Sequence, residues 1–299
     1  MPCFVNAHCH LELTGLAGEL PRNKPFFEWL ALLRKHVENW TKQDYQASYI
    51  KGLELSRKAG TDIIYDVGNQ LSEPFNNSQL STFNSQLSTF NSQLSTLNSQ
   101  LSTLNSQLPT LNSQLISMHE IIKHPLPPPC TPHSIYATPP ELVKQAVKSC
   151  VKAGIPWSIH LAEFDESDRF GDFLEIFSDE PALVKNGFIV HGNFLTESDL
   201  NFMAKNNIAL VHCPQSHEWF GHRDPDFEMW KKSGVDICIA TDSLASADSL
   251  DLREQVKTLF RRYPKAFTHE EALAAITSTP GKYLAKTIRC AVNANSMFQ

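Results

Sequence analysis

From residue 157 onward the chain alternates short apolar runs with helix-like segments, and this alternation constrains the fold more than any other feature. The apolar runs lie at 157–160, 187–191, 208–212 and 235–241, and the helix-like segments that follow them lie near 173–177, 197–205, 227–232 and 252–260. Strands that alternate with helices predict a parallel sheet. In parallel α/β folds the functional side chains lie beyond the carboxyl ends of the strands. We therefore expect an α/β fold with its site at that edge.

The first half of the chain follows the same pattern less regularly. Helix-like segments at 26–37 and 44–59 precede a strand-like run at 61–67. Further on, 116–122 is typical of a strand and 140–152 of a helix. The connection at 125–132 contains too many prolines to hold a helix, because proline cannot donate the backbone hydrogen bond.

A seven-residue repeat, Asn-Ser-Gln-Leu-Ser-Thr-Phe/Leu, occupies 77–115. Its apolar positions fall three and then four residues apart, which is the a/d pattern of a coiled coil. The other positions are Ser, Thr, Asn or Gln, which are mostly poor helix formers, and no charges flank the apolar ones. We interpret the segment as a low-complexity insertion that is mobile or marginally helical, with a coiled-coil homodimer as the alternative. Without these 39 residues, 260 remain, which suits one barrel.

The composition limits the kinds of partner that this protein can bind. The formal net charge of -6 provides no basic face for a nucleic acid polymer, and no apolar run reaches the roughly 18 residues that span a membrane. The N-terminus shows no secretory signal, and the seven cysteines include no Cys-x-x-Cys pair. This cysteine usage favours reduced thiols. We expect a cytoplasmic protein that acts on a small molecule and needs neither nucleic acid nor a membrane.

Two histidines close the first apolar run of the chain. His8 and His10 are separated by one residue, so on a strand their side chains point to the same side. Neutral imidazole is a good ligand for zinc or iron. Because His-x-His is common by chance, the pair gains weight only from similar residues at later strand ends.

Later strand ends carry such residues. His160 and Asp242 each end an apolar run, and with the first two histidines they form a ligand set suited to one divalent ion, zinc or iron. A bound metal lowers the pKa of water towards about 7 and so supplies hydroxide. His191, one strand further, is placed to take a proton or stabilise charge, and Glu163 to relay a proton to a leaving amine. Each residue alone has a structural explanation; their joint occurrence favours a metal site.

Other residues are candidates for the substrate pocket. His212 ends the strand that follows the one ending in His191. We expect its side chain either to support the metal ligands from behind or to contact the substrate. Trp219, Phe220 and His222 are candidate pocket walls, in no particular order.

Six motifs together resemble the amidohydrolase superfamily. They are Asn-Ala-His-Cys-His-Leu-Glu at 6–12, Pro-His-Ser-Ile-Tyr at 132–136, His-Leu-Ala-Glu at 160–163, Val-His-Gly-Asn at 190–193, His-Cys-Pro-Gln-Ser-His at 212–217 and Ala-Thr-Asp-Ser-Leu-Ala-Ser at 240–246. The branch resembled holds the cytosine, guanine, S-adenosylhomocysteine and aminofutalosine deaminases and the triazine chlorohydrolases. Apart from the repeat, the resemblance spans residue 1 to about 285.

The resemblance implies a distorted (β/α)8 TIM barrel. Members of this family usually carry a small β-sandwich domain as well, and we expect this chain to lack most of it. The barrel would consist of 1–76 and 116–285, followed by an atypical tail at 286–299. The implied site is mononuclear, with His8, His10, His160 and Asp242 as ligands, Glu163, His191 and Asp242 as catalytic residues, and His133 as a substrate contact. No lysine stands where the fourth strand should end, which disfavours the binuclear, carbamylated-lysine form.

These observations predict a metal-dependent hydrolase of non-peptide carbon–nitrogen bonds. It would deaminate a cyclic amidine, such as a nucleobase or nucleoside, by attack of metal-bound hydroxide, with Zn2+ or Fe2+ as the metal. Two alternatives stay open at this point. One is a related hydrolase that releases chloride or cleaves an amide, and the other is a decayed, non-catalytic relative.

Overall fold

The computed structural model describes residues 3–68, 114–123, 130–164 and 169–284. The proposed insertion at 77–115 and the tail at 286–299 lie outside these ranges, except for Gln114 and Leu115. Those two residues already belong to a strand, which begins two residues earlier than the repeat suggests.

The described strands form two parallel sheets of four strands each. The first sheet contains, in spatial order, β1 (Phe4–Cys9), β2 (Thr61–Gly68), β3 (Gln114–Ile121) and β4 (Cys130–Pro132). The second contains β5 (Trp157–Leu161), β6 (Gly187–His191), β7 (Ile208–His212) and β8 (Ile237–Ile239). Single parallel bridges join the sheets at both seams, between Cys9 and Asp242 and between Ser134 and His160. The predicted parallel α/β architecture is confirmed.

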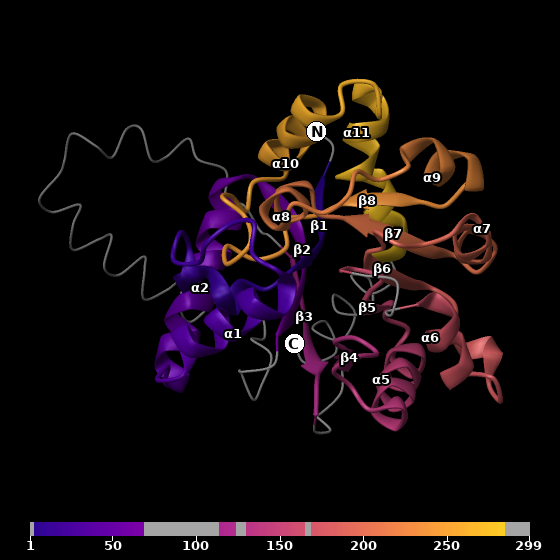
Figure 1. The fold of residues 1–299 in the computed structure, drawn as a ribbon, viewed down its shortest axis with the longest axis horizontal. Helices are drawn as coiled ribbons and strands as arrows, with labels where there is room; N and C mark the ends of the chain where they lie inside the picture. Colours follow the sequence, from indigo (N-terminus) through magenta and orange to yellow (C-terminus); the bar gives the residue numbers. More distant parts are fainter. Residues whose placement is uncertain (1–2, 69–113, 124–129, 165–168, 285–299) are drawn as a thin grey trace, which may run out of the picture.

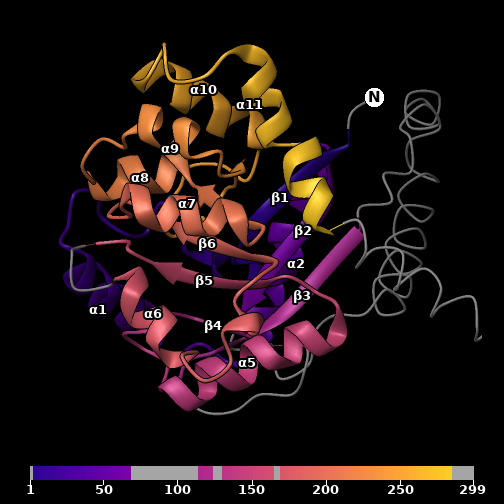
Figure 2. The same ribbon diagram turned by 90° about the vertical axis from the view of Figure 1, so that its right-hand side faces the viewer.

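Helices surround the two sheets (Figures 1 and 2). The α-helices in the described residues are α1 (Phe26–Val37), α2 (Lys42–Lys58), α5 (Pro140–Ala153), α6 (Phe170–Ile176), α7 (Glu197–Lys205), α8 (Pro214–Phe220), α9 (Phe227–Ser233), α10 (Leu252–Arg262) and α11 (His269–Ala275). Two 3-10 helices, η1 (Leu11–Leu16) and η2 (Pro181–Leu183), complete them. Of these, α2 packs against β2, α5 against β4 and β5, α7 against β7, and α10 and α11 against β8.

Local sequence explains where several helices begin and end. The Thr41 hydroxyl accepts a hydrogen bond from the Asp44 amide, and the Asp44 carboxylate accepts one from the Thr41 amide. Helix α2 therefore begins at Lys42, two residues before the predicted start. Gly154 ends α5 with a φ of 69°, a left-handed conformation that glycine adopts without strain. The strands between the helices are buried on both faces; β5, β6 and β7 expose no residue.

Some elements differ from the sequence prediction. Strand β8 is limited to Ile237–Ile239, shorter than the predicted 235–241. β4 occupies the end of the proline-rich connection, where no strand was predicted. Helices α8 and α11 were not predicted. Among the described residues, every helix is too short or too polar to cross a membrane.

Candidate active site

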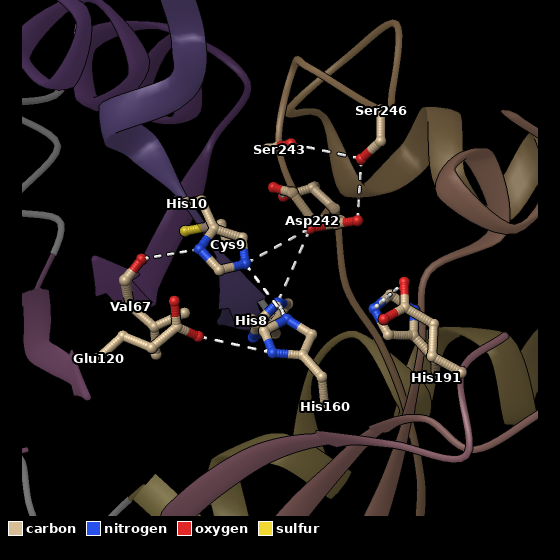
Figure 3. Close-up of polar contacts among 12 residues, drawn as sticks. His8, Cys9, His10, Val67, Glu120, His160, His191, Asp242, Ser243 and Ser246 are labelled. Carbon is tan, nitrogen blue, oxygen red and sulfur yellow. Dashed lines mark hydrogen bonds and ion pairs between the residues drawn. The ribbon is translucent and has the colours of Figure 1, made fainter. Parts of the chain in front are cut away.

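The carboxyl ends of three strands bring four metal-ligand candidates together. His8 lies on β1 and His10 follows its end, His160 lies on β5, and Asp242 follows β8. All four are buried, with exposed fractions between 0% and 9%. Figure 3 shows the three imidazoles turned toward one another and toward the Asp242 carboxylate. The structure therefore assembles from distant segments the set that the sequence predicted.

The facing atoms are the Nε2 nitrogens and one carboxylate oxygen. The Nε2 atoms of His8 and His160 are 3.2 Å apart, and those of His10 and His160 are 3.3 Å apart. Asp242 Oδ1 lies 3.8 Å from His8 Nε2 and 3.7 Å from His10 Nε2. A tetrahedral ion with zinc–nitrogen bonds of about 2.0 Å separates its ligand atoms by about 3.3 Å. These separations fit a single ion of that size.

Hydrogen bonds on the outer side of the rings fix which nitrogen faces inward. His10 Nδ1 lies 3.0 Å from the Val67 carbonyl oxygen, and His160 Nδ1 lies 3.0 Å from the His133 carbonyl oxygen. A carbonyl only accepts, so both Nδ1 atoms carry the hydrogen and both Nε2 lone pairs face the centre. The Ser246 hydroxyl donates to Asp242 Oδ2 at 2.9 Å, which leaves Oδ1 for a cation. The Nε2 lone pairs of His10 and His160 face each other with no hydrogen between them, so they repel. A cation bound between them would remove this repulsion.

Burial keeps the imidazoles neutral, the form that binds metal. It lowers the pKa of His8 and His10 and brings the pKa of His160 to about 4. Burial by itself raises the pKa of Asp242, but the nearby His191 and His10 outweigh it, so this pKa lies below its ordinary value. The set therefore presents three neutral nitrogens and a carboxylate to a cation.

Two of the three predicted catalytic residues, Glu163 and His191, form a pair beside these candidate ligands. Glu163 follows the end of β5, His191 ends β6, and Glu163 Oε1 lies 3.4 Å from His191 Nε2. Burial lowers the pKa of His191 well below its ordinary value. The backbone is left-handed at Ala162, His191 and Asp242, with φ of 53°, 71° and 59°. Non-glycine residues rarely adopt this conformation, and here it occurs at the ends of three site-forming strands.

A cavity of about 420 Å³ opens over this floor. His10, His160, Glu163, His191 and Asp242 line its bottom. Helix α1 supplies one wall through Phe26, Phe27, Trp29, Leu30, Leu33, Arg34 and Val37, and Tyr136 and Phe220 add aromatic surface. An apolar chamber with a few polar groups at one end suits a flat heterocyclic ligand.

The substrate-contact candidates fall into two groups. His133 and Phe220 line the cavity. His212 instead packs against His217, Phe227 and Trp230, away from it.

Trp219 and His222, two further residues predicted to form walls of the pocket, do not line the cavity. Trp219 is buried in a cluster with Leu16, Leu20, Trp29 and Ala245, and the Arg22 guanidinium lies 4.2 Å from its ring centre. His222 packs against His217 and Phe220 and is not among the cavity-lining residues.

Sequence reasoning missed the buried acids of this region. Glu120 near the end of β3 and Glu12 in η1 both line the cavity, with exposed fractions of 3% and 4%. Asp66 on β2 lies behind them and accepts a hydrogen bond from the Leu11 amide at 2.8 Å. Burial raises the pKa of Asp66 to about 8 and that of Glu120 well above its ordinary value. The strand-end rule that identified His160 applies equally to Glu120.

Comparison with known proteins agrees with this geometry. The model of the amidohydrolase family matches residues 1–288. A 5-methylthioadenosine/S-adenosylhomocysteine deaminase of Thermococcus sibiricus is 30% identical over 42% of this chain and 31% of its own length. One of Halobacterium salinarum is 22% identical over 86% of this chain and 60% of its own length, so the chain spans less than two thirds of either relative.

A solved structure shares the fold. An adenosine deaminase from Xanthomonas campestris with bound zinc superimposes with a TM-score of 0.66 at 18% identity, covering 95% of this chain and 67% of that one. With the family model matching nearly the whole length, this chain belongs to the amidohydrolase family.

Proposed function

We propose that this protein is a metal-dependent hydrolase that deaminates a cyclic amidine, such as a nucleobase or nucleoside. The observation that carries the proposal is the convergence of three Nε2 atoms and Asp242 Oδ1 beside the Glu163–His191 pair, at the floor of one cavity. The names of the relatives and of the structural neighbour, all deaminases, support a carbon–nitrogen bond as the target.

We further propose that the ligands of one divalent ion are His8, His10, His160 and Asp242, with Zn2+ as the metal. Three imidazoles and a carboxylate are typical zinc ligands, and the neighbour from Xanthomonas campestris carries zinc. When bound, such an ion lowers the pKa of water towards about 7 and makes a nucleophilic oxygen available at neutral pH.

In this proposal Glu163 moves the protons. Its carboxylate takes one proton from the attacking water and gives it to the ring nitrogen. It then takes the proton of the hydroxyl group that has added to the ring and gives it to the leaving amine, so that water is consumed and ammonia is released. His191, neutral and 3.4 Å away, orients the Glu163 carboxyl group and hydrogen-bonds to the oxygen that adds to the ring. His133 and Phe220, which line the cavity, contact the substrate ring.

We also propose that the two sheets are halves of one distorted (β/α)8 barrel. The parallel bridges at both seams, Cys9 to Asp242 and Ser134 to His160, support this closure. Closure matters for function because it holds β1 and β5, which carry His8 and His160, at a fixed separation.

The test is ammonia release from a panel of nucleobases and nucleosides by protein reconstituted with Zn2+. We expect at least one panel member to be deaminated, and Glu163→Gln to lower kcat by about 10²–10⁴-fold without changing metal content. Glu175→Gln is the matched control, because Glu175 is an exposed glutamate at the end of α6. Unchanged turnover in Glu163→Gln contradicts the role of Glu163, and no release from the whole panel contradicts deamination.

A further inference from the structure

One buried acid of the cavity has no task in the proposed mechanism. Glu120 lies one residue before the end of β3, is 3% exposed and lines the cavity. Figure 3 shows its carboxyl group beside His160, while His191 lies on the other side of that ring. Glu120 therefore faces the cavity from the side opposite the catalytic pair.

The hydrogen-bonding capacity of Glu120 is largely unused. Within the described residues, the one polar side-chain contact of its carboxyl group is to His160 Nδ1, at 3.5 Å. The hydrogen on that nitrogen is already directed to the His133 carbonyl oxygen at 3.0 Å. Because a buried carboxyl group without donors is costly, these oxygens are available to a ligand in the cavity.

The acidic residues that line the cavity are buried, whereas the lysine and the arginine that line it are exposed. Glu12 lines the same cavity and is 4% exposed. Its carboxyl group packs closely on Gly68: a Cβ added to that glycine would lie 2.9 Å from Glu12 Oε2. With Glu120, Glu163 and Asp242, four carboxyl groups therefore line this cavity. The lysine and arginine that line the cavity, Lys123 and Arg34, are exposed to solvent and screened. A cation that reaches the floor thus meets an excess of carboxyl groups.

We propose that Glu120, supported by Glu12, binds a positively charged nitrogen group of the substrate, so that the heterocycle carries a basic amine, amidine or guanidine besides the amino group that is removed. This inference rests on the proposed function and narrows its substrate class. A carboxylate pairs with such a group through charge-assisted hydrogen bonds, which are stronger in a buried site than in water.

A second metal ion is the competing explanation for Glu120. Ligand atoms of Glu120, His133 and His160 lie within 4.8 Å of one another. His160 Nδ1, however, donates its hydrogen to a carbonyl oxygen, and a metal there would require that hydrogen bond to be lost. We therefore favour the substrate contact and include the second metal as an outcome of the test.

The experiment measures equilibrium binding without turnover. Zinc-loaded Glu163→Gln protein is titrated calorimetrically with 9-(2-aminoethyl)adenine, a cation at neutral pH, and with its neutral partner 9-(2-hydroxyethyl)adenine. We expect the cation to bind at least about tenfold more tightly. Adding Glu120→Gln should abolish this preference by weakening the binding of the cation. Adding Glu12→Gln, a second variant in case the first fails to fold, should reduce the preference, and adding Glu175→Gln should not.

Several results overturn the proposal. They are equal or tighter binding of the neutral ligand, no binding of either ligand at millimolar concentration, and a preference that survives Glu120→Gln. Two metal ions per chain that fall to one in Glu120→Gln assign this residue to a second metal and overturn it as well. A cation preference with no ammonia released from any panel substrate contradicts the proposed function alone, because binding is measured separately from turnover.

Discussion

The side-chain amide of Asn193 donates a hydrogen bond from Nδ2 to the backbone oxygen of Glu163, with 2.7 Å between the two atoms. Asn193 Oδ1 accepts a hydrogen bond from His217 Nδ1 at 3.1 Å, and Arg223 donates two to the Asn193 backbone oxygen at 2.9 and 3.1 Å. These contacts join the segments that follow β5 and β6 to α8. They fix the backbone of Glu163, and Asn193 is not among the residues that line the cavity, so we expect Asn193 to act by positioning Glu163.

Asn193→Asp tests this positioning. The variant keeps an acceptor for His217 but replaces the donor with a carboxylate that faces the Glu163 carbonyl oxygen. We expect kcat for ammonia release to fall about tenfold to a hundredfold, because small displacements of a catalytic group are costly, with KM and metal content little changed. Steady-state kinetics and elemental analysis measure these effects. An unchanged kcat in a folded variant contradicts the positioning role.

Gly192 is required by both conformation and space. Its φ is +62°, and an added Cβ would lie 2.4 Å from Leu210 Cδ1 and 2.8 Å from Leu195 Cδ1. We expect Gly192→Ala to lower the free energy of unfolding by about 2–4 kcal/mol, through backbone strain and overpacking. The matched control is Gly171→Ala in α6, where nothing lies within 4 Å of the added Cβ. Helix propensity predicts that it stabilises by up to about 1 kcal/mol. Urea unfolding measures the free energy of unfolding of both variants. Equal changes in the two variants would contradict the explanation by strain and overpacking at Gly192.

Asp66 makes stability depend on pH. Burial raises its pKa from 3.8 to about 8, so the folded protein retains a proton that the unfolded chain loses as the pH rises. The stabilisation is present below about pH 4 and is lost as the pH rises towards about 8. In Asp66→Asn this dependence is absent, while an oxygen still accepts from the Leu11 amide. Measured by urea unfolding in chelator, wild type should lose stability relative to Asp66→Asn across this window. A difference that does not vary with pH contradicts the assignment.

Much of the architecture could be predicted because the strands of the second sheet are continuous apolar runs between helices. The missed elements carry weaker signals. β4 is a three-residue strand that ends in a proline, and α8 has seven residues without a clear apolar period. Helix α11 could have been found, since Thr268 and Glu271 form a capping box that is visible in the sequence.

The positions of the four candidate metal ligands could be predicted because each lies at or just beyond a strand end. The direction of a side chain at such a position could not be predicted. His191 and His212 end neighbouring strands at the same level, since Val190 pairs with Val211. His191 has a φ of 71° and faces the cavity, whereas His212 continues β7 and packs against Trp230 of α9. Backbone conformation at one residue thus decides which histidine reaches the site, and sequence patterns do not specify it.

The central claim is that His8, His10, His160 and Asp242 bind one metal ion, and metal content per chain tests it most directly. After reconstitution with Zn2+ and removal of excess metal, we expect about one zinc per wild-type chain, as the four-ligand set predicts. His160→Asn should lose the ion, while His212→Asn, which alters a buried strand-end histidine outside the cavity, should retain it. No bound zinc in the folded wild type, or equal zinc in His160→Asn and wild type, would contradict the account.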